Sequence, residues 1–213
     1  MREIDLKTWY RTDFFLFYKG FQSSLFNITT EVDVSDAYAF CKEKNISFFI
    51  FCLYVFLKAA NEVPQFRHRL INDKVFDMEK LDATTPIMLP NDENHQFTMI
   101  RCIYQSTFSE FNKIVAEQIK NASSGIAPDN DKADQRDLIC LNCVPWFHFT
   151  GGAHACISPH GTIPLLNWGK FKEENNQKIM PYFLQASHMF VDGYHVGVLA
   201  QKVADYFAHP ESV

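Results

Sequence analysis

The sequence lacks three features that would each define a class of protein. Its longest apolar run, residues 46–60, contains Lys58 and is shorter than the roughly 20 residues of a membrane-spanning helix. Its 25 acidic residues outnumber 20 basic ones, which argues against a general nucleic-acid-binding protein. Glu3 and Asp5 stand near the start, and no apolar run with a cleavage site follows them, so we expect no secretory signal. We therefore expect neither a membrane nor a nucleic acid among its partners.

The six cysteines do not have the spacing of a disulfide scaffold. Without a secretory signal, this predicts reduced thiols and a cytoplasmic protein. Cys140 and Cys143 form a C-x-x-C pair, which is typical of redox pairs and of half a zinc site. His148, His154 and Cys156 follow, but their spacing matches no standard zinc site. Metal or redox chemistry is therefore our least favoured hypothesis, and we predict no metal.

The composition is that of one globular domain with a large core. The 213 residues suffice for a single domain, and we treat residues 1–213 as one. Hydrophobic residues make up 47% and aromatic residues 15%, including 21 Phe, which favours an aromatic-rich core or apolar pockets. We find no internal repeat or low-complexity tract.

Hydrophobic periodicity predicts a mixture of helices and strands. The expected helices cover residues 12–20, 35–44, 46–61, 109–120 and 194–208. The expected strands cover residues 24–32, 65–71, 97–104, 138–144, 163–168 and 178–186, and residues 121–135 suggest an exposed connection. Because these elements do not alternate regularly, we predict an α/β fold, a two-layer sandwich of helices on a mixed or antiparallel sheet.

The stretch "ASHMFVDGYHVG" contains the strongest candidate for chemistry. His188 stands where a predicted strand ends, a position at which functional groups often project from a rigid scaffold. Histidine suits proton transfer near neutral pH, and apolar surroundings keep it uncharged and available as a base. The alternative from spacing alone is a core histidine followed by a helix-capping Asp192. Near the N-terminus, Arg11 is either a surface residue or the partner of a distant carboxylate.

Together these residues resemble the chloramphenicol acetyltransferase family. The resemblance extends along almost the whole chain. It includes Trp9 and Arg11 of W-x-R, Phe17-Tyr18, Pro145-Trp146, "IPLLNWGKF" and the final H-x-x-x-D-G with its Tyr-His-Val continuation. H-x-x-x-D-G also occurs in the acyltransferase cores of 2-oxoacid dehydrogenase complexes, in peptide-synthetase condensation domains and in plant acyltransferases. The chain length, the W-x-R motif and the P-W pair favour the chloramphenicol acetyltransferase family over these others.

The resemblance implies a CoA-dependent acyltransferase fold, a homotrimer with active sites between subunits, and an antibiotic-resistance activity. Acetyl-CoA would be the co-substrate and a small hydroxyl compound, by default chloramphenicol, the acceptor. His188 would be the general base, and Asp192 would pair with Arg11 to brace its loop. The resemblance places CoA near Pro145, Lys170 and Phe171, and the acceptor near Phe17, Tyr18 and Phe26.

Several positions depart from the family pattern. Asn142 stands where the family has a serine that donates a hydrogen bond to the tetrahedral intermediate; an amide N–H can still stabilise an oxyanion. Gln22, Gly152 and His154 differ from the usual acceptor pocket. Two alternatives therefore stay open: an O-acetyltransferase of another hydroxyl compound, and a catalytically weak ligand-binding relative.

Overall fold

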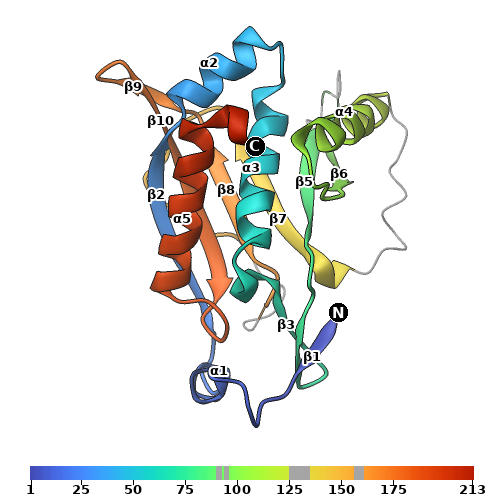
Figure 1. Cartoon of the computed structure of the whole chain (residues 1–213), viewed down its shortest axis with the longest axis vertical. Helices are drawn as coiled ribbons and strands as arrows, with labels where there is room; N and C mark the ends of the chain where they lie inside the picture. The colour runs from blue at the N-terminus through green and yellow to red at the C-terminus, as the bar shows by residue number, and fades with distance from the viewer. Residues whose placement is uncertain (90–92, 94–95, 125–134, 156–160) are drawn as a thin grey trace.

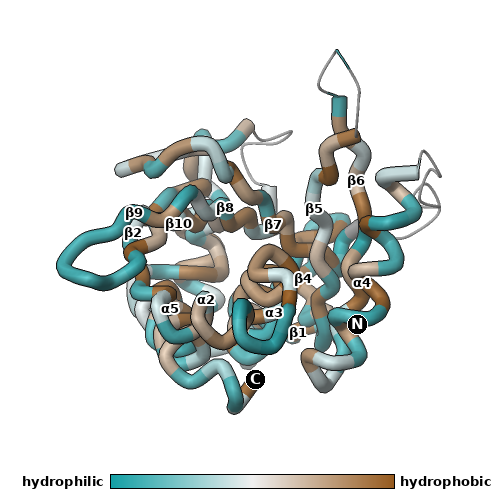
Figure 2. The backbone as a smooth tube through the Cα atoms, turned by 90° about the horizontal axis from the view of Figure 1, so that it is seen from above, coloured by the Kyte–Doolittle hydropathy of each residue, from teal (hydrophilic) through white to brown (hydrophobic). Residues whose placement is uncertain are grey.

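A computed structural model describes residues 1–89, 93, 96–124, 135–155 and 161–213. Within these residues the chain folds into two main layers, a seven-stranded sheet and a set of helices packed on one of its faces. Figure 2 shows the molecule from above, with the helices on one side of the strands. The predicted α/β two-layer fold is confirmed.

The large sheet is mixed. Its order is β2-β10-β8-β7-β5-β6, and β9 pairs with β10. β7 runs parallel to its neighbours β5 and β8, and the other pairings within the described residues of this sheet are antiparallel. The strands are β2 (Leu25–Asp33), β5 (Asp82–Met88), β6 (Phe97–Cys102), β7 (Leu138–Val144), β8 (Leu165–Gly169), β9 (Lys172–Glu174) and β10 (Gln177–Ser187).

The core lies between this sheet and its helices. α3 (Phe48–Asn61) packs on β7 and β5 and also contacts α2 (Ser35–Glu43), α4 (Phe108–Ser123) and α5 (Gly193–Ala208). Because α3 is surrounded on all sides, nearly every residue from Ile50 to Asn61 is buried. The helix begins after Ser47, whose hydroxyl accepts a hydrogen bond from the Ile50 N–H at 3.4 Å.

Outside the main layers lie a small sheet and one short helix. The small sheet has the order β1-β4-β3, formed by β1 (Arg2–Ile4), β4 (Lys74–Asp77) and β3 (His68–Ile71). α1 (Thr12–Lys19) lies at the lower end of the molecule in Figure 1, away from the other helices. It buries only Phe15 of its own residues and leaves an apolar face exposed, comprising Phe14, Leu16 and Phe17.

Most predicted elements are present with small shifts at their ends. The expected strand 65–71 is wrong in its first part, because Pro64–Arg67 forms a 3₁₀ helix with Pro64 at its start. We missed β1, β4, β5 and β9, two of them only three residues long. The strands of three or four residues among them, β1, β4 and β9, depend on pairing with distant strands rather than on a local pattern. The expected connection at 121–135 begins as the end of α4, and residues 125–134 lie outside the described residues.

Candidate active site

His188 lies directly after β10, and its imidazole packs against two aromatic rings. The Tyr18 ring of α1 stacks on it at 4.1 Å between centroids and 7° between planes, and the Phe26 ring of β2 lies at 4.5 Å. The His188 N–H donates to the Ser24 carbonyl at 2.7 Å, which joins the end of β10 to the start of β2. His188 Nδ1 is buried, and no hydrogen-bond partner for it occurs among the described residues. Tyr18 and Phe26, both expected near the acceptor, therefore lie against His188.

Arg11 fixes the backbone that follows His188. Its guanidinium is buried and donates three hydrogen bonds: Nη2 to the His188 carbonyl at 3.1 Å, Nε to the Met189 carbonyl at 3.1 Å, and Nη1 to Asp192 Oδ2 at 2.8 Å. The expected Arg11–Asp192 pair is thus present. Because the guanidinium is planar, these three contacts fix the turn in one orientation relative to α1.

Asp192 also caps helix α5. Its Oδ1 accepts hydrogen bonds from the N–H groups of Tyr194 at 3.1 Å and His195 at 3.5 Å. Partial burial by itself would raise the pKa of the Asp192 carboxyl, but the Arg11 hydrogen bond and the neighbouring positive charges lower it below the ordinary 3.8. Burial lowers the pKa of His195 below 6.5, against the opposing effect of Asp192. Near neutral pH, Asp192 is therefore an anion and His195 is uncharged.

A cavity of about 750 Å³ lies on another part of the sheet. Its walls are mainly apolar, from Phe49 of α3 and from β5, β6 and the β7–β8 region. Its polar side chains include Asn142 of β7, Asn167 of β8 and His154 of the connection between these two strands. Asn142 and Asn167 are paired in register on adjacent strands, and Asn167 Oδ1 is buried without a hydrogen-bond partner in the described chain. The size and lining suit a small, mostly apolar molecule that offers a few polar groups.

The loop after β7 covers part of the sheet face opposite the helices. Gly152 lies so close to the Phe183 ring that a Cβ atom there would be 2.4 Å from Phe183 Cε1. The His154 N–H donates to Gln185 Oε1 at 3.0 Å. The two unusual positions Gly152 and His154 therefore hold this loop against β10.

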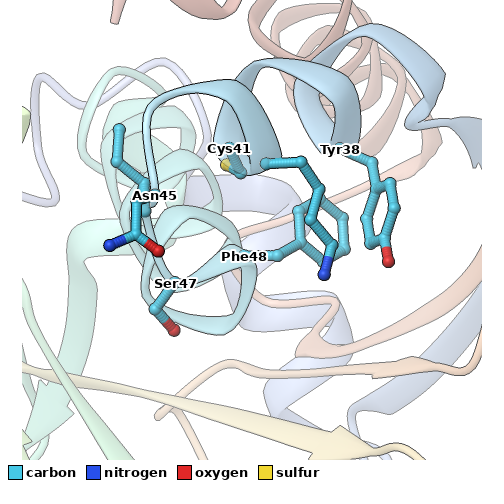
Figure 3. A pocket seen from close by; sticks show the side chains of 7 residues that line it. Tyr38, Cys41, Asn45, Ser47 and Phe48 are labelled. Atoms are coloured by element: carbon cyan, nitrogen blue, oxygen red, sulfur yellow. The ribbon is translucent and has the colours of Figure 1, made fainter.

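The residues expected near CoA lie at the carboxyl ends of β7 and β8. Pro145 lines the large cavity, and the Lys170 N–H donates to the Phe147 carbonyl at 3.0 Å. The Phe171 ring meets Tyr38 of α2 edge to face at 5.1 Å. Tyr38 in turn lines a smaller cavity of about 270 Å³ between α2 and the start of α3. Figure 3 shows Tyr38 and Phe48 side by side on one wall of this cavity.

Phe17 differs from its neighbour Tyr18. It is 60% exposed and contacts Tyr18 and Phe21, at 5.2 and 4.9 Å between ring centroids. No contact between Phe17 and His188 occurs among the described rings. Phe17 therefore extends the aromatic surface around the histidine outward.

His188 and Asn142 do not lie together within the chain. The strand register aligns Asn142 with Asn167 and Phe183, whereas His188 follows five positions after Phe183. This offset corresponds to roughly 17 Å along β10 and roughly 10 Å across two strand spacings. Accordingly, His188 is absent from the described lining of the 750 Å³ cavity.

Comparison with known proteins identifies the family. A sequence model described as chloramphenicol acetyltransferase matches residues 1–204. The chain belongs to the chloramphenicol acetyltransferase family. It is therefore an acyltransferase.

Individual relatives are distant in sequence but similar over their full length. The chain is 26% identical to the chloramphenicol acetyltransferase of Staphylococcus aureus, covering 98% of this chain and 96% of the relative. It is 25% identical to that of Bacillus pumilus, with 92% and 88% covered. A solved chloramphenicol acetyltransferase structure superposes with a TM-score of 0.88 at 31% identity, over 97% of this chain and 99% of that one.

The fold also occurs outside this family. The cubic core of the pyruvate dehydrogenase multienzyme complex superposes with a TM-score of 0.64 at 14% identity, over 100% of this chain and 93% of that one. At that identity the likeness concerns the fold alone.

The structure adds three residues to which the sequence assigned no role. Asn167 interrupts an apolar strand, which is the signal that could have marked it. His195 stands three residues after Asp192, at the position of a capping-box partner. Lys178 of β10 places its Nζ 5.4 Å from the ring centroids of both Phe171 and Tyr38, two residues that the local sequence pattern does not place beside it.

The histidines of the hypothetical metal site bond elsewhere. His148 Nε2 lies 2.9 Å from Glu31 Oε1, and His154 Nδ1 lies 2.9 Å from the Ala155 carbonyl oxygen. Burial raises the pKa of the Cys143 thiol to about 12, and Cys156 lies outside the described residues. In the part of the chain that the structure describes, no three His, Cys, Asp or Glu side chains form a possible metal site, and no helix is long and apolar enough to span a membrane.

Proposed function

We propose that the protein transfers the acetyl group of acetyl-CoA to a hydroxyl of a small, largely apolar acceptor, with chloramphenicol as the first candidate. The observation that carries this proposal is the fixed position of His188. Its imidazole stacks on Tyr18, and the carbonyl of the same residue is held by Arg11. A base positioned in this way needs no large movement before it accepts a proton.

The proposed reaction proceeds without an acyl-enzyme. His188 removes the acceptor hydroxyl proton while the oxygen attacks the thioester carbonyl carbon. The carbonyl oxygen becomes an oxyanion, toward which the Asn142 amide donates an N–H. The carbon–sulfur bond then breaks, the acetyl ester is formed, and the CoA sulfur leaves with the proton held by His188. Asp192 stays ionised throughout and positions the loop through Arg11.

We further propose that the active site forms between subunits of a homotrimer. The register separates His188 and Asn142 within one chain, so both can reach one thioester only if each comes from a different subunit. The exposed apolar side chains of α1 beside His188 support such a contact, because large exposed aromatic patches mark interfaces. They are Phe14, Leu16 and Phe17, and exposed Phe21 follows the helix.

CoA would lie at the carboxyl ends of β7 and β8. Pro145 lines the cavity that would receive the acetyl group, and the Phe171 ring offers a stacking face for the adenine. Lys170 and Lys178 would provide cations for its phosphates. The acceptor would contact Tyr18, Phe26 and Phe17 around His188 in one subunit and the 750 Å³ cavity of the next.

One assay tests the activity. The protein is mixed with acetyl-CoA and chloramphenicol, free CoA is followed with a thiol reagent, and acetylated product is identified by mass spectrometry. Chloramphenicol-dependent release with stoichiometric product supports the proposal. Absence of turnover on chloramphenicol and on a panel of other alcohols contradicts it and favours a ligand-binding relative. Turnover of other alcohols alone identifies a different acceptor, which Gln22, Gly152 and His154 favour.

Subunit mixing tests the shared site. His188→Ala and Asn142→Ala chains are unfolded together and refolded as a mixture. If the site is shared, mixed trimers contain interfaces with both native residues, and about a quarter of native activity returns at equal ratio. Refolding each variant alone is the control and should give no such recovery. If mixing restores no activity, His188 and Asn142 do not act together across one interface.

A further inference from the structure

His195 is a residue to which neither the family motif considered above nor the proposed reaction assigns a role. It is buried in the first turn of α5, with 8% of its surface exposed. Its Nδ1 lies 3.2 Å from the Asp192 N–H and 2.9 Å from Asp192 Oδ1. The imidazole therefore contacts both the backbone and the side chain of Asp192.

These contacts form a capping box with histidine in place of the usual Glu or Gln. In a capping box, the side chain at the third helical position accepts a hydrogen bond from the N-cap N–H. Here uncharged His195 accepts from Asp192, while Asp192 Oδ1 accepts from the N–H of His195. The N-cap residue is thereby held at both its backbone and its carboxylate.

The hydrogen bonds continue from His195 to the backbone of His188. His195 holds Asp192, whose Oδ2 accepts from Arg11 Nη1 at 2.8 Å. Arg11 Nη2 then donates to the His188 carbonyl at 3.1 Å. Each step is a direct contact, and Asp192 is shared between its two partners through different oxygens: Oδ1 faces His195, and Oδ2 faces Arg11.

We propose that His195 is a positioning residue for the transfer reaction, which orients Asp192 so that Arg11 can hold His188 in its reactive position. The proposal rests on the proposed function, because it assumes that His188 is the base. Without the His195 ring, the Asp192 N–H loses its acceptor, so the N-cap residue whose carboxylate meets Arg11 is held less firmly. His188 would then spend less time in the orientation that accepts the acceptor proton.

Two substitutions at His195 separate this role from simple packing. His195→Ala removes the ring and its hydrogen bonds. His195→Gln keeps an acceptor for the Asp192 N–H, as in the common capping box, and adds a donor for Asp192 Oδ1. We expect His195→Ala to lower kcat about tenfold or more with the acetyl-CoA KM changed less than twofold, because His195 is not among the residues proposed to bind CoA. We expect His195→Gln to recover most of kcat.

Val196→Ala provides the matched control. Val196 is adjacent in the same helix and is buried, and its side chain is not part of the contacts around Asp192. The substitution should lower Tm by an amount similar to that of His195→Ala while leaving kcat near native. If Val196→Ala lowers kcat as much as His195→Ala, or if His195→Gln is as slow as His195→Ala, the loss comes from destabilisation and the proposal is wrong.

Amide hydrogen exchange provides a measurement that does not depend on turnover. In His195→Ala, the amides of residues 189–192 should exchange at least about tenfold faster than in the native protein, and His195→Gln and Val196→Ala should restore or keep their protection. Unchanged exchange in His195→Ala overturns the proposal. If the native protein transfers no acetyl group, the proposed function fails by itself, and the exchange result still decides whether His195 holds the loop.

Discussion

Arg11 and Asp192 stand 181 positions apart in the sequence, yet Arg11 Nη1 lies 2.8 Å from Asp192 Oδ2. The contact joins the start of α1 to the start of α5. It also determines where the His188 turn lies, because the same guanidinium holds the His188 and Met189 carbonyls. The His188 turn is therefore held by residues from both ends of the chain.

This pair predicts coupled losses of stability. Asp192→Asn and Arg11→Ala should each lower the free energy of unfolding by about 1–3 kcal/mol, which is typical for the loss of a hydrogen bond to a charged group. The loss is limited because the Asp192 side chain is a third exposed to solvent. Because they share one interaction, the double variant should lose less than the sum of the two single losses. Denaturant unfolding of all four proteins measures this. Strict additivity would show that the two do not interact energetically.

The same pair predicts a dependence on acid. The pKa of Asp192 is lowered in the folded protein, so its stabilising contribution is complete above the ordinary pKa of 3.8 and is lost as pH falls below that value. Thermal unfolding between pH 3 and pH 6 should show a smaller acid-induced loss in Asp192→Asn than in the native protein. Parallel curves for the two proteins would contradict this expectation.

His68 predicts a second acid effect at higher pH. Burial lowers its pKa to about 4, and its ring lies edge-on to Trp9 and Phe190. The unfolded chain binds this proton near pH 6.5 and the folded chain does not, so stability falls as pH decreases from about 6.5 to about 4, by on the order of 3 kcal/mol. His68→Phe should remove most of this pH dependence, because phenylalanine does not bind a proton. The substitution breaks no hydrogen bond of Nδ1, which is buried without a partner among the described residues. The test is the Tm of both proteins at pH 7.5 and pH 5. An equal fall in Tm for the native protein and His68→Phe would contradict the expectation.

His188→Ala should abolish transfer while preserving the fold. Loss of a general base costs about 10²–10⁴-fold in rate. The Tm and the binding of acetyl-CoA should stay near native, because the ring contacts only Tyr18 and Phe26 among the described aromatic pairs. The rate is measured by CoA release and binding by calorimetry. Near-native turnover in this variant would refute the mechanism.

Asn142→Ala should lower kcat by about 10²-fold with little change in the acetyl-CoA KM. A donor used only in the transition state affects kcat rather than ground-state binding. Asn142→Ser restores the family's hydroxyl and should retain or raise activity. The comparison requires steady-state kinetics of both variants on the best acceptor. If the alanine variant matches the native enzyme, another donor stabilises the oxyanion.

Gly152→Ala should destabilise the loop on the open sheet face. The new Cβ would lie 2.4 Å from the Phe183 ring, so the loop or the ring must move, at a cost of roughly 1–3 kcal/mol. Gly151→Ala is the matched control, because nothing lies within 4 Å of a Cβ atom at that position. Thermal unfolding should show a lower Tm for Gly152→Ala only. An equal fall in Tm for both variants would mean that lost chain flexibility, rather than the contact with Phe183, causes the change in stability.

The sequence by itself determined the fold class and the main helices, and it singled out the His188 turn as the candidate site. The amphipathic periods of α4 and α5 are local properties, and β7 and β10 are long apolar runs, so these elements were predictable. The resemblance also paired Arg11 with Asp192, which the geometry confirms. Pro64 shows the limit: a run that suggested a strand begins as a 3₁₀ helix instead.

Only the tertiary structure decided which residues of paired strands become neighbours. Asn142 and Asn167 become neighbours through the parallel pairing of β7 and β8, and no local pattern encodes that register. Likewise, Lys178 reaches Phe171 only because β9 folds back on β10. The physical reason is the same in each case. These contacts join residues that are far apart in the chain or lie on paired strands. Their geometry is set when the apolar faces of the sheet and the helices are buried against each other.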